Sequence, residues 1–148
     1  MTRGEQHLTD RGEGLLRRWQ RKPVLDQVTG RLRAPRAAFE PRFPDPTKPN
    51  REVDEALSVN VESSLRSVNL SLTWGITDPV KQYMARVTVA DCAALTLEAW
   101  HAPIRTPDHP ENPHHGLIWG LVEMHADDEL RYEQTVDALG HASTIATD

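Results

Sequence analysis

With 148 residues, a net charge of −5 and 38% hydrophobic residues, the chain is long enough for one domain with its own core. No apolar run approaches the roughly 20 residues that cross a bilayer, residues 1–14 lack the apolar centre of a secretory signal, and the single cysteine, Cys92, cannot form an internal disulfide. We therefore expect a cytoplasmic protein without membrane contacts. Its N-terminal segment, residues 1–14, is expected to be flexible, and residues 15–148 to form a single domain.

The charges are unevenly distributed along the chain. Residues 1–36 contain nine Lys and Arg against four Asp and Glu, whereas residues 87–148 contain two against eleven. A basic N-terminal stretch suits an acidic partner, such as nucleic acid or another protein, but the two ends can equally neutralise each other within one fold. Both interpretations stay open, although the negative total is unlike that of a dedicated nucleic-acid-binding protein.

The first third of the chain predicts strands joined by turns and loops. Residues 15–19 read as a short strand, and residues 26–30 as a turn in which Gly30 supplies positive φ. Residues 31–39 return as a second strand, which Pro35 confines to a sheet edge or ends. Four prolines within residues 41–50 predict a surface loop, because each one removes a backbone donor and fixes φ.

In the middle of the chain two periods overlap. Residues 57–61 alternate as a strand, whereas the apolar residues within 61–72 recur with the spacing of a helix. We predict a strand that leads into a helix ending near Trp74. Residues 85–89 alternate as a further strand, after which Asp91 is expected to cap a short helix.

The last third combines a loop, a strand and a helix. Prolines enforce an irregular loop over residues 103–113, and residues 116–124 are apolar enough for a buried strand. Asp127 or Asp128 caps a final helix, which Gly140 is expected to end.

Together with a short edge strand over residues 143–146, these elements predict an α+β fold. Its expected architecture is a short mixed or antiparallel sheet packed by two to three helices.

Several short motifs follow the order of a known family layout. They are Leu16-Arg17-Arg18, Thr29-Gly30-Arg31 with Arg33, Ala37-Ala38-Phe39, Leu57-Ser58-Val59, and Pro113 with His115 before an apolar strand. Over residues 15–146 the chain resembles a family of small uncharacterised bacterial proteins with the layout LYRR…RPSSAAF…LSVD…EEPAHALVVG. The resemblance implies a bacterial cytosolic protein and brings no particular activity. The chain departs from the family at Pro35-Arg36, where serines are usual, and in its acidic final helix, where the family is basic.

The loop between residues 101 and 115 is rich in histidine. His109, His114 and His115 are candidate zinc ligands, but their spacing is loose and the adjacent pair points apart in an extended chain, so no metal site is expected. His115 is the best single candidate residue. It is either a general base or pH-sensitive contact, or a structural residue whose ring bonds the backbone carbonyls of the loop.

A second candidate site consists of Arg18 or Arg17 with Ser58 and His115. Their order along the chain resembles that of compact ADP-ribosyltransferase-like proteins, including RES-type toxins that degrade NAD. The resemblance implies an arginine that grips pyrophosphate as a fork and a serine that orients the nicotinamide amide. It also implies a later acidic residue, for which the candidates are Glu98 and Glu123.

The basic N-terminal residues, with Trp19 beside them, could also follow a phosphate backbone. They are Arg17, Arg18, Arg21, Lys22, Arg31, Arg33 and Arg36.

Three functions are therefore open. Because no complete catalytic motif is present, the first hypothesis is a non-catalytic accessory protein without a cofactor. It would bind another protein, within a larger bacterial complex, through Arg17, Arg18, Arg33 and His115. The alternatives are a small NAD-directed enzyme and a nucleic-acid-binding protein.

Overall fold

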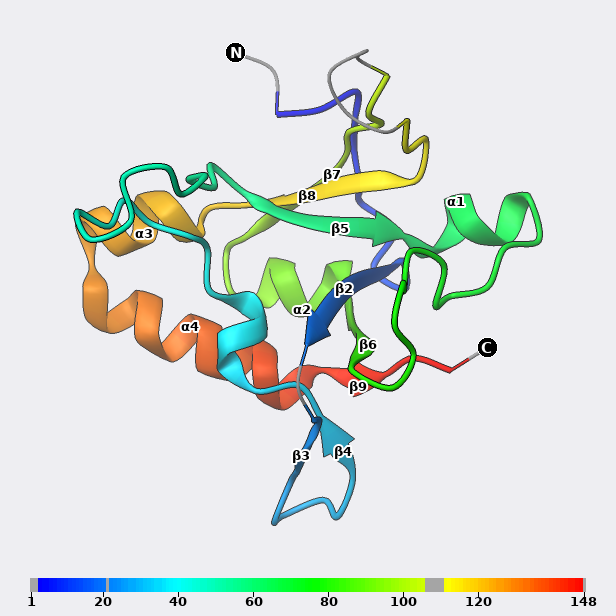
Figure 1. The fold of residues 1–148 in the computed structure, drawn as a ribbon, viewed down its shortest axis with the longest axis horizontal. Helices are drawn as coiled ribbons and strands as arrows, with labels where there is room; N and C mark the ends of the chain where they lie inside the picture. Colours follow the sequence, from blue (N-terminus) through cyan, green and yellow to red (C-terminus); the bar gives the residue numbers. More distant parts are fainter. Residues whose placement is uncertain (1–2, 21, 106–110, 148) are drawn as a thin grey trace.

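A computed structural model describes residues 3–20, 22–105 and 111–147. A seven-stranded sheet runs through them in the order β1 (Gln6–His7), β7 (Glu98–His101), β8 (His115–Trp119), β5 (Leu57–Val61), β2 (Gly14–Gln20), β6 (Gln82–Thr88) and β9 (Thr144–Ile145). Every neighbouring pair of strands is antiparallel, and β3 (Val24–Leu25) pairs with β4 (Leu32–Arg33) in a separate hairpin. The helices are η1 (Arg36–Phe39), α1 (Glu62–Ser67), α2 (Val89–Ala94), α3 (Leu121–Asp127) and α4 (Glu129–Ala142). The expected α+β fold with an antiparallel sheet is confirmed (Figure 1).

No helix among the described residues is both long enough and apolar enough to cross a membrane.

Residues 3–8 lie along the edge of the sheet, where β1 pairs with β7. The backbone N–H of Glu5 donates to the carbonyl of His101 at 2.8 Å, and that of Leu8 donates to the carbonyl of Ala99 at 2.9 Å. The indole of Trp119 donates to the carbonyl of Arg3 at 2.8 Å. The sequence gives no hint of this strand because an edge strand bonds through its backbone, which any side chain permits.

Alternate residues of β2 face two separate apolar clusters. Leu15 belongs to the main core, where the sheet packs against α2, α3, α4 and η1. Leu16 points to the opposite face, where it joins Leu65, Leu72 and Met84 in a smaller cluster. The second face is therefore covered by α1 and the turns of residues 68–81 rather than by long helices.

Two of the predicted helices differ in extent or cap from expectation. The helix that begins after β5 ends at Ser67, not near Trp74, and Asn69 then turns the chain at a φ of 58°. The helical spacing continues past this point because Leu65 and Leu72 enter the same apolar cluster from different elements. In α2 the N-cap is Thr88, and Asp91 completes its capping box from the third helical position.

The apolar run after the proline loop divides into two elements. Strand β8 ends at Trp119, and Gly120, at a φ of 122°, turns the chain into α3 instead of extending the strand to Met124. Asp128 caps α4 as expected, since its side chain accepts from the N–H of Arg131.

Gly140 does not end α4, which continues to Ala142. A Cβ at this position would lie 3.1 Å from the nitrogen of Arg36 and 3.2 Å from the carbonyl oxygen of Ala34. The glycine therefore permits close packing of α4 against the chain before η1. The expected edge strand follows as β9 and pairs with β6.

Candidate functional site

A pocket of about 410 Å³ opens on the second face of the sheet. Its floor comes from β2, β5, β6 and β8, and its walls come from residues 74–75, residue 104 and residues 111–112. The residues around it are Leu16, Arg17, Arg18, Ser58, Val59, Asn60, Trp74, Gly75, Met84, Ile104, Glu111, Asn112 and His115. We call it the Ser58 pocket. Its volume falls within the range of roughly 300–1,000 Å³ that is usual for small-molecule sites.

Strand pairing brings Ser58 and His115 together in this pocket. His115 is the register partner of Asn60, two residues from Ser58, so the two side chains are diagonal neighbours on one face. His115 Nε2 lies 3.2 Å from the Ser58 hydroxyl, and His115 Nδ1 lies 2.8 Å from the carbonyl oxygen of Ala102. The hydroxyl of Ser58 is exposed, whereas the imidazole is half-buried.

The hydrogen bond between His115 Nδ1 and the carbonyl of Ala102 determines which nitrogen of the neutral imidazole carries the proton. A carbonyl oxygen only accepts, so Nδ1 of His115 carries the proton and Nε2 accepts from Ser58. Burial lowers the pKa of His115 below its ordinary value, and His101 nearby lowers it further, while the bond to Ala102 opposes them. The lowered pKa favours the neutral form of the ring. The bond to the Ala102 carbonyl is the contact that the structural interpretation of His115 describes.

The two adjacent arginines of β2 occupy different environments. Arg17 is directed toward η1 and β5, donating from Nε to the carbonyl of Ala38 and from Nη1 to that of Ser58, both at 2.9 Å. Burial is the main cause that lowers the pKa of Arg17. Arg18 is exposed and donates to the carbonyl of Gly75 at 2.8 Å. Within the described part of the chain, no carboxylate lies within 4.0 Å of either guanidinium.

Two asparagines that the sequence did not single out hold the pocket wall. The side chain of Asn112 donates to Asn60 at 3.1 Å and accepts from the backbone N–H of His114 at 2.9 Å. Asn60 also donates to the carbonyl of Trp74 at 3.3 Å. Asn60 falls on the polar side of the alternation over residues 57–61, so the strand pattern did not mark it as a buried residue.

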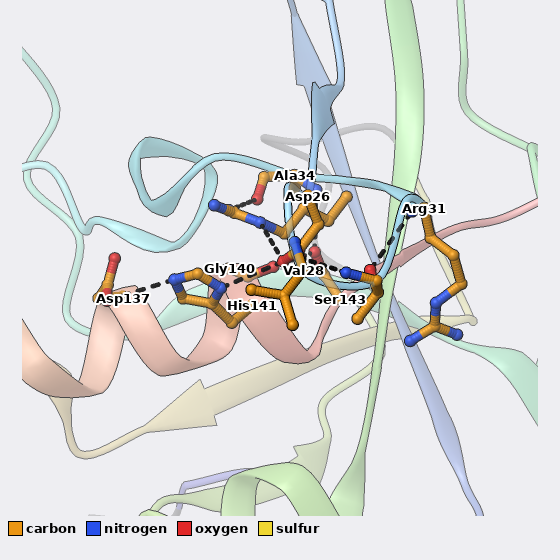
Figure 2. A network of polar contacts seen from close by, with 10 residues as sticks. Asp26, Val28, Arg31, Ala34, Asp137, Gly140, His141 and Ser143 are labelled. Carbon is orange, nitrogen blue, oxygen red and sulfur yellow. Dashed lines mark hydrogen bonds and ion pairs between the residues drawn. The ribbon is translucent and has the colours of Figure 1, made fainter.

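Arg33 does not line the Ser58 pocket, and it bonds instead to Asp26. Asp26 belongs to a polar network that we call the Asp26 anchor (Figure 2). Its members are Asp26, Arg33, Ala34, Gly140, His141 and Ser143. The carboxylate of Asp26 accepts from the N–H groups of Val28 at 2.9 Å and Thr29 at 3.0 Å. The same carboxylate accepts from Arg33 Nε at 3.2 Å and lies 3.4 Å from His141 Nδ1.

A buried serine completes the Asp26 anchor. The Ser143 hydroxyl accepts from the N–H of Ala34 at 2.9 Å and donates to the carbonyl of Gly140 at 2.7 Å. Together these contacts fasten the β3–β4 hairpin to the end of α4. Arg33, proposed from the sequence as a binding residue, is thus engaged inside the fold.

The histidines of the proline loop make separate contacts. His114 is buried, with Nδ1 2.8 Å from the Ser64 hydroxyl and its ring edge-on to Trp74, whereas His109 lies outside the described residues. Residues 3–20, 22–105 and 111–147 include no group of three or more His, Cys, Asp or Glu that could hold a metal ion. Burial also raises the pKa of the Cys92 thiol to about 12, so this residue is unsuited to act as a nucleophile.

Comparison of the chain with protein-family models, with curated proteins and with solved structures finds no match. The chemistry of the Ser58 pocket is therefore the basis on which a function is inferred.

Proposed function

We propose that this protein is a small enzyme that acts on an anionic small molecule bound in the Ser58 pocket. The observation that favours it is the meeting of Arg18, Ser58 and His115, from three strands, around one pocket. A serine hydroxyl hydrogen-bonded to a neutral histidine, whose other nitrogen is held, is an arrangement suited to proton transfer. This geometry favours the enzyme over the accessory protein that the sequence suggested first.

The charge around the pocket supports an anionic ligand. Arg18 uses one donor on Gly75, and none of the ion pairs formed among the described residues involves it. A guanidinium has five N–H donors in a planar fork that matches phosphate and carboxylate groups. The remaining donors of Arg18 can therefore bind a ligand without breaking a bond within the protein.

Inorganic pyrophosphate is the simplest probe of this proposal. Calorimetry with the purified protein is expected to give measurable binding, and Arg18→Gln is expected to weaken it about tenfold or more. Arg31→Gln is the matched control, because Arg31 is exposed on the hairpin and does not line the pocket. Equal affinity in the wild type and in Arg18→Gln would contradict the proposed anion site.

NAD is the specific substrate that the resemblance to ADP-ribosyltransferase-like proteins suggests. The carboxylates considered for this reaction do not reach the pocket: Glu98 bonds Trp100 and Arg3, and Glu123 is in α3. The carboxylate at the rim is Glu111. If the wild type releases nicotinamide from NAD and Glu111→Gln does not, a NAD-directed enzyme is supported. If the wild type releases none over hours, this hypothesis is contradicted.

Binding to a partner protein stays a prediction from the sequence. The described surface that suits it best is the β3–β4 hairpin, where Val28 is 94% exposed and Leu25 and Leu32 are about half exposed. A partner that is retained by the wild type and lost with Val28→Ser would support this hypothesis.

Nucleic-acid binding is favoured less by the arrangement of the basic residues. Arg36 pairs with Glu40 and Glu133, Arg33 pairs with Asp26, and Arg21 lies outside the described residues. Binding to single-stranded DNA that weakens steeply with salt would restore this alternative.

A further inference from the structure

The pairing of Ser58 with His115 differs from a second serine–histidine pair nearby. In the second pair, His114 faces Ser64 through Nδ1, at 2.8 Å, and its ring is buried against Trp74. In the first pair, Nδ1 of His115 is occupied by a carbonyl, which directs Nε2 to an exposed hydroxyl in a pocket. Of these two pairs, only Ser58 and His115 combine an accessible hydroxyl with an imidazole whose tautomer is fixed by a hydrogen bond to a carbonyl.

We propose that Ser58 is a nucleophile, that His115 is its general base, and that the substrate is a carboxylic ester with an anionic group for Arg18. This inference rests on the proposed function and adds the reaction class to it. The third group of the arrangement is the neutral carbonyl of Ala102 rather than a carboxylate, so it stabilises an imidazolium less than an aspartate does. Esters, whose leaving groups depart more readily than those of amides, are therefore the better substrates.

The reaction balances with water as the only co-reactant. Ser58 Oγ attacks the ester carbonyl carbon while its proton moves to His115 Nε2. The bond from carbon to the alcohol oxygen then breaks, and the departing alkoxide takes this proton, which leaves an acyl group on Ser58. Water next attacks the acyl carbon and gives its proton to Nε2, and that proton returns to Ser58 Oγ as the carboxylic acid departs.

Arg17 is a positioning residue for this step. Its Nη1 donates to the carbonyl of Ser58 and its Nε to that of Ala38, each at 2.9 Å, so it fastens the backbone of the nucleophile to η1. Strand β5 is also paired on both sides, with β2 and β8, which holds the hydroxyl on a rigid element.

A fluorophosphonate probe tests Ser58 directly, because its reaction forms an O–P bond at an activated serine and releases fluoride. Mass spectrometry of the wild type is expected to locate one phosphonyl group on Ser58, and Ser58→Ala is expected to lose it. Ser64→Ala, the matched control, should be labelled at the wild-type rate. His115→Ala should slow labelling about 100-fold or more.

The pH dependence of labelling tests His115 in the wild-type protein, without relying on a folded variant. Among the described residues, His101 from β7 acts on the charge of the His115 ring, and Arg17, Arg18 and Glu111 line the same pocket. An ordinary histidine, with a pKa of about 6.5, would leave roughly a quarter of the maximal rate at pH 6. Burial lowers the pKa of His115, so a larger share is expected to remain. A rate that does not fall at lower pH would overturn the role of His115.

The two proposals fail separately. Absence of labelling on Ser58 at pH 8, in protein that binds pyrophosphate, would overturn the nucleophile and leave the anion site standing. Labelling of Ser58 in protein that binds no pyrophosphate would overturn the anion site and leave the nucleophile standing. Equal labelling of the wild type and a folded His115→Ala variant would show that Ser58 reacts without this base.

Discussion

The Ser58 pocket and the Asp26 anchor each combine an arginine with a histidine. They differ in the group that accepts the hydrogen bond of the arginine. In the anchor, Arg33 donates to the carboxylate of Asp26, which also faces His141. In the pocket, Arg18 donates to a backbone carbonyl, and no carboxylate within the described residues pairs with it. Paired charge stabilises the fold, whereas a cation that keeps free donors is available to a ligand.

The largest effect on stability is expected from removing the charge at the centre of the Asp26 anchor. Asp26→Asn replaces a carboxylate that accepts from two backbone N–H groups and from Arg33. The melting temperature should fall by several degrees, as circular dichroism can measure, while pyrophosphate binding to the folded protein stays unchanged. An unaltered melting temperature would contradict the structural role of the anchor.

Acid should weaken the same anchor in the wild-type protein. The backbone N–H groups of Thr29 and then Val28 are the main causes that lower the pKa of Asp26 from 3.8 to about 2. Because the folded pKa lies below the unfolded one, the contribution of Asp26 is present above pH 3.8 and is lost as the pH falls toward 2. Urea unfolding across this window should show a steeper decline in the wild type than in Asp26→Asn.

A smaller effect is expected at the buried end of the anchor. Ser143→Ala leaves the N–H of Ala34 without its acceptor, which should lower the free energy of unfolding by about 1–3 kcal/mol. Ser67→Ala is the control, because the Ser67 hydroxyl is exposed and donates to the carbonyl of Ser64. Its expected change is within about 0.5 kcal/mol. Equal losses in the two variants would show that burial of Ser143 contributes nothing.

The smallest change in stability is expected in the pocket. Arg18→Gln removes an exposed guanidinium with one bond to the Gly75 carbonyl, so the free energy of unfolding should change by less than about 0.5 kcal/mol. Arg33→Gln should lower stability more and leave pyrophosphate binding intact. If Arg18→Gln lowered the free energy of unfolding more than Arg33→Gln did, and Arg33→Gln lost pyrophosphate binding, the distinction between the two regions would be contradicted.

Local patterns in the sequence predicted much of the fold. Strands were expected at residues 15–19, 57–61 and 85–89, the last two from alternation, and Asp127 or Asp128 was expected as a helix cap. The errors occurred where distant residues decided the outcome. Leu72 continues the helical spacing of apolar residues, although the helix itself ends at Ser67. Gly140 resembles a residue that ends a helix, but it permits close packing against the backbone of Ala34 and Arg36.

The sequence by itself determined the residue types of the candidate site. Arg17, Arg18, Ser58 and His115 were candidates because of their order along the chain, and His115 also because it comes before an apolar strand. Only the tertiary structure decided that Ser58 faces Nε2 of His115, that Arg18 lines their pocket and that Arg33 does not. The physical reason is strand register: pairing His115 with Asn60 places residues far apart in the chain on one face, and no local pattern encodes which strands become neighbours.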